Sequence, residues 1–142
     1  MTLYFAYGAN LDAGAMKERC PEARRLGPAT LEDHCFTIVS GGYGHAAPAT
    51  GSRIYGWLWE LSPADLAALD AFEGSGYRQE YAEVRAEGGP QSAMLYRARN
   101  PAPGRPVPGY LEGIIDSARK LGFPAAYVTE LERLLADGVI LE

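Results

Sequence analysis

Residues 54–61 (IYGWLWEL) form a run in which apolar side chains occupy both odd and even positions. Because neighbouring side chains of a strand point to opposite faces, such a strand has to be covered on both sides. The run therefore predicts a central strand. Immediately after it, Ser62-Pro63-Ala64-Asp65 provides the capping serine, the first-position proline and the acidic third residue that start a helix. We expect that helix to end at Gly74.

The rest of the sequence predicts further strands, helices and turns on both sides of this strand and helix. The glycine-rich stretch 41–52 predicts a long surface loop, and residues 88–90 (GGP) predict a turn. The remaining predicted elements are strands at 3–7, 35–39, 81–86 and 92–97, a short helix at 13–19, and helices around 111–121 and 127–135. Together they predict one α+β domain over residues 1–142.

The composition excludes two classes of function. Thirteen basic and 18 acidic residues give a net charge of −5, so the chain lacks the basic excess that displaces counterions from nucleic acid. The longest stretch without a formal charge, residues 34–52, holds four glycines and Pro48 and is unsuited to a continuous membrane helix. No basic signal region follows Met1. We therefore expect a cytoplasmic protein in which Cys20 and Cys35 are free thiols.

Three kinds of site are not supported by residue spacing. Cys20, Cys35, His34 and His45 include neither of the close pairs that metal sites use. The sequence has no G-x-S-x-G nucleophile turn. Residues 41–44 (GGYG) lack both the spacing and the lysine of a phosphate loop. The sequence therefore predicts no metal site.

Glu73 is the candidate for acid–base chemistry. On a helix that turns about 100° per residue, Glu73 falls within the apolar stripe of Leu66 and Leu69, whereas Asp70 lies at its edge. Burial raises the pKa of a carboxyl group, and the negative end of the helix dipole acts in the same direction. Both effects suit a group that exchanges a proton near neutral pH. The alternative is that the helix frays at Phe72 and Glu73 simply reaches water.

A second candidate feature lies where the first strand gives way to a helix, at residues 7–11 (YGANL). Glycine permits an unusual backbone turn, and free N–H groups at a helix start can bind an anion. Asn10 and Asp12 are both able to cap the helix that follows. The same residues are equally compatible with an ordinary strand-to-helix turn.

Three segments together resemble the gamma-glutamylcyclotransferase, or AIG2-like, family. Residues 5–11 (FAYGANL) resemble its Y-G-S-N-L motif, and residues 69–74 (LDAFEG) resemble its L-D-x-x-E-G motif, with a Tyr-Arg step following at residues 77–78. Residues 106–131 resemble its closing segment, in which P-S-x-x-Y precedes two helices joined by G-L-P. Two residues depart from the pattern, because Ala9 and Val107 each replace a serine.

The resemblance implies a small mixed-strand β-barrel flanked by helices, with a pocket at its mouth. It also implies that the α-amine of a small-molecule γ-glutamyl substrate attacks its own γ-carbonyl, releasing 5-oxoproline and an amine without a metal or organic cofactor. By the same resemblance, Glu73 would carry the proton from the α-ammonium to the leaving amine, and backbone amides of the first motif would hold substrate oxygens. The implied substrate-binding residues are Tyr7, Gly8, Ala9, Asn10, Leu11 and Tyr110.

Two alternatives stay open at this point. The substrate can be a γ-glutamylamine instead of a γ-glutamyl amino acid, or the domain can be a non-catalytic binding module of the same fold. The presence of Glu73 argues against the binding module, whereas the loss of the motif hydroxyl at Ala9 argues weakly for it. The sequence is also compatible with a homodimer.

Overall fold

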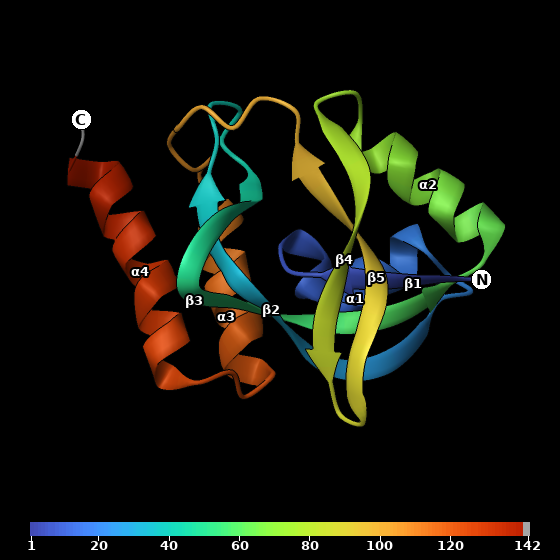
Figure 1. Cartoon of the computed structure of the whole chain (residues 1–142). Coiled ribbons are helices and arrows are strands. Elements are labelled where there is room, and N and C mark those ends of the chain that lie inside the picture. The colour runs from blue at the N-terminus through green and yellow to red at the C-terminus, as the bar shows by residue number, and fades with distance from the viewer. Residues whose placement is uncertain (141–142) are drawn as a thin grey trace.

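The computed structural model describes residues 1–140, with side chains to residue 136, so the last two residues of the predicted domain lie outside the described part. Within it, five strands close into a barrel in the order β1-β3-β2-β4-β5 (Figure 1). Neighbouring strands are antiparallel except β1 and β5, which run parallel and pair through Tyr4 and Met94. The predicted mixed-strand barrel is confirmed. The strands are β1 (Thr2–Ala6), β2 (Arg24–Ile38), β3 (Gly44–Leu61), β4 (Tyr77–Ala86) and β5 (Gly89–Ala98).

Helices flank the barrel on two sides. Figure 1 shows α2 on one side of the strands and α4, with α3, on the other. The helices are the 3₁₀ turn η1 (Ala9–Leu11), α1 (Ala13–Arg19), α2 (Pro63–Glu73), α3 (Tyr110–Lys120) and α4 (Ala125–Ile140). Each predicted helix is present. In residues 1–140 no helix is long and apolar enough to cross a membrane, and both cysteines are free.

Strand β1 is buried on both faces because its side chains alternate between two hydrophobic clusters. Tyr4 and Ala6 pack in one cluster with Met16 of α1 and Leu69 of α2. Phe5 packs in the other, larger cluster. This two-sided burial anchors the strand that leads into η1.

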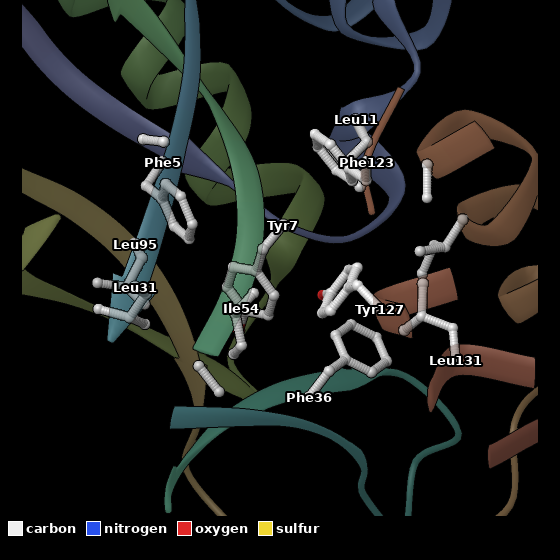
Figure 2. Packing of buried hydrophobic residues seen from close by; sticks show 14 of the residues in the cluster. Phe5, Tyr7, Leu11, Leu31, Phe36, Ile54, Leu95, Phe123, Tyr127 and Leu131 are labelled. Carbon is white, nitrogen blue, oxygen red and sulfur yellow. The ribbon is translucent and has the colours of Figure 1, made fainter. Parts of the chain in front are cut away.

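The larger cluster continues from the barrel to the two carboxyl-terminal helices. Figure 2 follows it from Phe5, Leu31 and Leu95 among the strands to Tyr127 and Leu131 of α4. The helices α3 and α4 thus share one continuous hydrophobic core with the strands of the barrel.

The predicted central strand at 54–61 is confirmed, since β3 lies between β1 and β2 in the barrel. The predicted surface loop at 41–52 is wrong, because β3 begins at Gly44 and pairs with β2 from there. Small residues at positions 44 and 46 allow this part of β3 to pack closely against its neighbours. A Cβ on Gly44 would lie 2.6 Å from the Phe36 ring, and Ala46 is fully buried.

The proline-rich segment 99–109 lies against the tip of the β2–β3 hairpin (Figure 1). The N–H of Ser40 donates to the carbonyl of Ala102 at 2.8 Å, and the N–H of Val107 donates to the carbonyl of Gly42 at 3.0 Å. These bonds tie the hairpin tip to the start of α3. They bring Tyr110, the first residue of α3, close to β3.

Gly56 is required by the close approach of β1 and β3. A Cβ at this position would collide with the backbone carbonyl of Ala6 and lie 2.6 Å from the Phe5 ring. We expect Gly56→Ala to lower the free energy of unfolding by about 2 kcal/mol, the usual cost of overpacking. Gly113→Ala, at an exposed position of α3 with open space around it, should raise it by about 0.5 kcal/mol. Urea denaturation of both variants tests this, and equal effects would contradict the packing account.

Candidate functional site

A pocket of about 360 Å³ opens where the end of β1, η1, the end of α2 and the starts of β3, β4 and α3 converge. Aromatic side chains form most of its wall, and its charged lining residues are Glu73 and Arg19. A single carboxylate and a single guanidinium in aromatic surroundings interact more strongly than they would in water, because the local dielectric constant is lower.

The pocket brings together most of the residues that the sequence singled out. Its lining includes Tyr7, Gly8, Ala9, Asn10, Glu73 and Tyr110. Leu11 is not part of the lining, since its side chain is buried in the larger hydrophobic cluster (Figure 2). The Leu11 N–H donates to the carbonyl of Gly8 at 3.0 Å, so Leu11 supports the turn from behind.

The turn after β1 lines the pocket with Gly8, Ala9 and Asn10. η1 is a 3₁₀ turn in which the N–H groups of Leu11 and Asp12 are bonded to the carbonyls of Gly8 and Ala9. The N–H groups of Ala9 and Asn10, at the start of the turn, have no acceptor within it. A Cβ on residue 8 would lie 3.1 Å from the Tyr110 hydroxyl, so a larger residue there would press on that hydroxyl.

Asn10 and Asp12 are both predicted helix caps, and in the structure Asp12 caps α1. The Asp12 carboxylate accepts hydrogen bonds from the N–H groups of Gly14 and Ala15 at the start of α1. The Asn10 side chain bonds instead to Tyr4 and Arg19. Asn10 is therefore part of the pocket wall.

Glu73 occupies the last turn of α2. The alternative of a frayed helix end is wrong, because the N–H of Gly74 donates to the carbonyl of Asp70 at 3.0 Å and the helix continues to Glu73. Leu69, one turn earlier, is fully buried, and Glu73 itself is partly buried. Burial raises the pKa of Glu73 from 4.5 to about 7, and the nearby charge of Arg19 lowers it. The predicted direction of the shift is confirmed.

Hydrogen bonds fix the tyrosines around Glu73. The Tyr7 hydroxyl donates to the carbonyl of Tyr96 at 2.5 Å. Gly44 is held twice, because its carbonyl accepts from the Tyr77 hydroxyl at 2.7 Å and its N–H donates to the Tyr110 oxygen at 2.9 Å. The rings thus stand in defined positions on a backbone that the barrel holds rigid.

Burial also keeps these phenols neutral. It raises the pKa of Tyr77 to about 12 and raises the pKa values of Tyr4, Tyr7, Tyr96 and Tyr110 well above the ordinary value for tyrosine. These hydroxyls can form hydrogen bonds at neutral pH but cannot act as bases. Proton acceptance near neutral pH therefore falls to Glu73.

Sequence reasoning missed Arg19 and Tyr4. From the sequence alone, Arg19 is explained as a cation that complements the end of a helix. Tyr4 is explained as a core residue of a buried strand. In the structure the Arg19 guanidinium lies 3.7 Å from the centroid of the Phe72 ring, and one of its nitrogens donates to Asn10 Oδ1 at 2.5 Å. No local pattern indicates these contacts, because they join three separate elements.

The cysteines and histidines considered above do not form a ligand set. Among the described side chains, no three His, Cys, Asp or Glu residues are grouped so as to hold a metal ion. His45 Nδ1 accepts a hydrogen bond from the N–H of Ala98 at 3.0 Å, and His34 Nε2 faces an Arg97 nitrogen at 3.1 Å. Both histidines hold strands of the barrel together.

Comparison with known proteins identifies related sequences. A family model described as gamma-glutamyl cyclotransferase, AIG2-like, matches residues 4–113. Gamma-glutamylcyclotransferases from Bos taurus and Homo sapiens are each 27% identical to the chain over 146 residues, which covers 93% of this chain and 78% of each relative.

Solved structures share the fold. A gamma-glutamyl cyclotransferase structure superimposes with a TM-score of 0.83 at 27% identity, covering 92% of this chain and 86% of the other. YkqA from Bacillus subtilis superimposes with a TM-score of 0.74 at 18% identity, covering 95% of this chain and 54% of YkqA. At that identity, the similarity to YkqA extends to the fold alone.

The raised pKa of Glu73 makes stability depend on pH. The folded-state pKa of about 7 lies above the ordinary value of 4.5, so the proton stabilises the folded state below pH 4.5 and this contribution is lost as pH rises through 7. Glu73→Gln has no such loss. We therefore expect the free energy of unfolding of Glu73→Gln, relative to that of wild type, to be about 1–2 kcal/mol higher at pH 8 than at pH 4.5. This range allows for the partial exposure of the side chain.

Urea denaturation of both proteins at pH 4.5 and pH 8 measures this difference. Glu132→Gln, at an exposed position of α4, is the matched control and should show no pH-dependent gain. A constant difference between Glu73→Gln and wild type across this range would contradict the raised pKa.

Proposed function

The chain belongs to the gamma-glutamyl cyclotransferase, AIG2-like family, and we propose that it converts a γ-glutamyl compound into 5-oxoproline and a free amine. The observation that carries the proposal is the position of Glu73, a carboxyl group with a pKa of about 7, in an aromatic pocket beside the backbone amides of η1. The family relation supports the reaction, and the pocket supplies groups suited to it.

Glu73 is proposed to move the protons. The substrate carries its α-amine as an ammonium ion, which is not a nucleophile, and an α-amino group has a pKa of about 8. A carboxylate of ordinary pKa is a weak acceptor for that proton, whereas one of pKa about 7 is matched to it. After accepting the proton, the Glu73 carboxyl group is acidic enough to protonate the leaving nitrogen.

The reaction balances without an added reactant. A bond forms between the α-nitrogen and the γ-carbon, and the bond between the γ-carbon and the leaving nitrogen breaks. The attacking nitrogen loses two protons, and the leaving nitrogen gains two to depart as an ammonium ion. No water, electron or cofactor enters the balance, so the proposed reaction is a cofactor-independent, cyclising cleavage of a C–N bond.

Positioning of the substrate is the other requirement. Ring closure is intramolecular, so the protein accelerates it by holding the α-nitrogen against the γ-carbon. We assign the N–H groups of Gly8, Ala9 and Asn10 to substrate carboxylate or carbonyl oxygens, because amides at a helix start attract negative charge. Tyr7 and Tyr110 shape the wall and orient the substrate.

Because this role uses backbone N–H groups, the side chain of residue 9 is not required for it. We expect Ala9→Ser to change kcat and KM for 5-oxoproline release by less than about threefold, below the effect of one hydrogen bond. Steady-state kinetics on the best substrate tests this. A larger gain in affinity or a change in substrate preference would assign the missing hydroxyl a direct contact.

The proposed activity is tested by 5-oxoproline release from a panel of γ-glutamyl amino acids and γ-glutamylamines. Wild type should turn over at least one member, and the best substrate identifies the leaving group. Glu73→Gln should reduce turnover at least 100-fold, because it removes the general acid–base group, while Glu132→Gln should leave turnover unchanged.

Two outcomes would contradict the proposal. Near-normal turnover by Glu73→Gln would remove Glu73 from the mechanism. Absence of turnover across the panel, together with thermal stabilisation by a γ-glutamyl compound, would indicate a non-catalytic binding module.

A further inference from the structure

Tyr4 lies at the pocket although sequence reasoning assigned it no role there. It belongs to β1, its side chain is almost fully buried, and it forms part of the pocket lining. Its ring packs edge-on against that of Tyr96, with the centroids 6.0 Å apart. The Tyr4 ring is therefore fixed, and its hydroxyl group has a defined place.

The direction of the hydrogen bonds at Tyr4 follows from the chemistry of its neighbours. The Arg19 guanidinium can only donate, so the Asn10 atom that faces it at 2.5 Å is the oxygen, Oδ1. The other atom of the Asn10 amide, Nδ2, therefore faces Tyr4. Because Nδ2 is a donor only, the Tyr4 oxygen accepts this bond at 3.0 Å. The hydroxyl proton of Tyr4 is left for another partner.

No acceptor for that proton is found among the described residues. Tyr110 shares this feature, because its oxygen accepts a bond from the Gly44 N–H and no acceptor is found for its own proton, whereas three other phenols of the pocket donate theirs. The protons of Tyr7, Tyr77 and Tyr96 are donated to the carbonyls of Tyr96 and Gly44 and to the carboxylate of Asp70. A buried hydroxyl that keeps a free donor is costly unless a ligand accepts the bond. Because Tyr4 lines the pocket, its free donor is available to bound substrate.

Tyr4 and the proposed base, Glu73, line the same pocket. After burial, the negative charge of Glu73 is the largest contribution that raises the pKa of Tyr4. A phenol with such a pKa stays protonated and can stabilise negative charge without giving up its proton. A base that serves both the attacking and the leaving nitrogen has to lie beside the γ-carbon, to which the carbonyl oxygen is bonded.

We propose that Tyr4 is a catalytic residue whose hydroxyl donates a hydrogen bond to the γ-carbonyl oxygen of the substrate, where negative charge develops during ring closure. Asn10 and Arg19 are positioning residues that fix the direction of this bond. The inference rests on the proposed cyclisation and adds to it the group that stabilises the oxyanion.

Tyr4→Phe tests the role directly, since it removes the hydroxyl and keeps the ring. We expect kcat for 5-oxoproline release to fall about 100-fold, as for loss of one oxyanion donor, with KM raised at most about 10-fold, the effect of one hydrogen bond in the ground state. Tyr127→Phe is the matched control, because it removes a buried phenol oxygen of α4 outside the pocket, and it should leave kcat unchanged.

Binding of 5-oxoproline adds a readout that does not require turnover. The lactam oxygen of this product is the former γ-carbonyl oxygen. Tyr4→Phe should therefore weaken 5-oxoproline binding about 3- to 10-fold in calorimetry, the effect of one hydrogen bond.

Asn10→Asp provides a second variant that keeps the Tyr4 hydroxyl. The new carboxylate can still pair with Arg19, but it accepts the proton of Tyr4 and diverts it from the substrate. We expect kcat, measured at the plateau of the pH profile, to fall by at least about 10-fold while the midpoint of thermal unfolding changes little. If Tyr4→Phe fails to fold, this variant decides the question.

The outcomes separate the inference from the proposed function. Wild-type kcat in Tyr4→Phe, or a rise in KM alone, would overturn the role of Tyr4 while the cyclisation stands. With Tyr4→Phe unfolded, wild-type kcat in Asn10→Asp would also overturn it. Wild type that neither releases nor binds 5-oxoproline would overturn the proposed function, and the role of Tyr4 with it.

Discussion

The two-sided burial of β1 is the constraint on which the rest of the structure depends. Five residues at the start of the chain are covered by α1 and α2 on one face and by the larger hydrophobic cluster on the other. This strand also closes the barrel by pairing with both β3 and β5. Its end therefore has little freedom, and the turn that follows, η1, is held at a fixed place in the pocket lining. Tyr4, within the strand, has its hydroxyl fixed by the same packing.

In the pocket, the charged groups of Glu73 and Arg19 are surrounded by aromatic side chains. Glu73 ends α2 and Arg19 ends α1, and these helices cover the same face of β1. Burial raises the pKa of Glu73 toward neutrality, and Arg19 limits the rise. Arg19 also stacks on Phe72 and holds Asn10. Arg19 thus both limits the pKa of Glu73 and orients the Asn10 side chain in the pocket. This coupling links the packing of two short helices to the proton chemistry proposed for the site.

Much of this arrangement could be predicted from the sequence, and the remainder has physical reasons. Glu73 was predicted because helical spacing places it beside Leu69, and the buried strand before Gly8 was predicted from its apolar run. The loop predicted at 41–52 is wrong because Gly44 and Ala46 serve close packing against Phe36 and its neighbours, which composition cannot distinguish from turn formation. Arg19 and Tyr4 were missed because their roles arise from tertiary contacts between separate elements. Local patterns carry no information on such contacts.

The central claim is that the fold turns an ordinary carboxyl group into a base that works near neutral pH. Titration of the Glu73 side-chain carboxyl by carbon-13 NMR tests it most directly, with the resonance assigned by its absence in Glu73→Gln. The account predicts a midpoint of about 7 in the folded protein. A midpoint near the ordinary value of 4.5 would contradict it, because the carboxylate would then be too weak a base for an α-ammonium group.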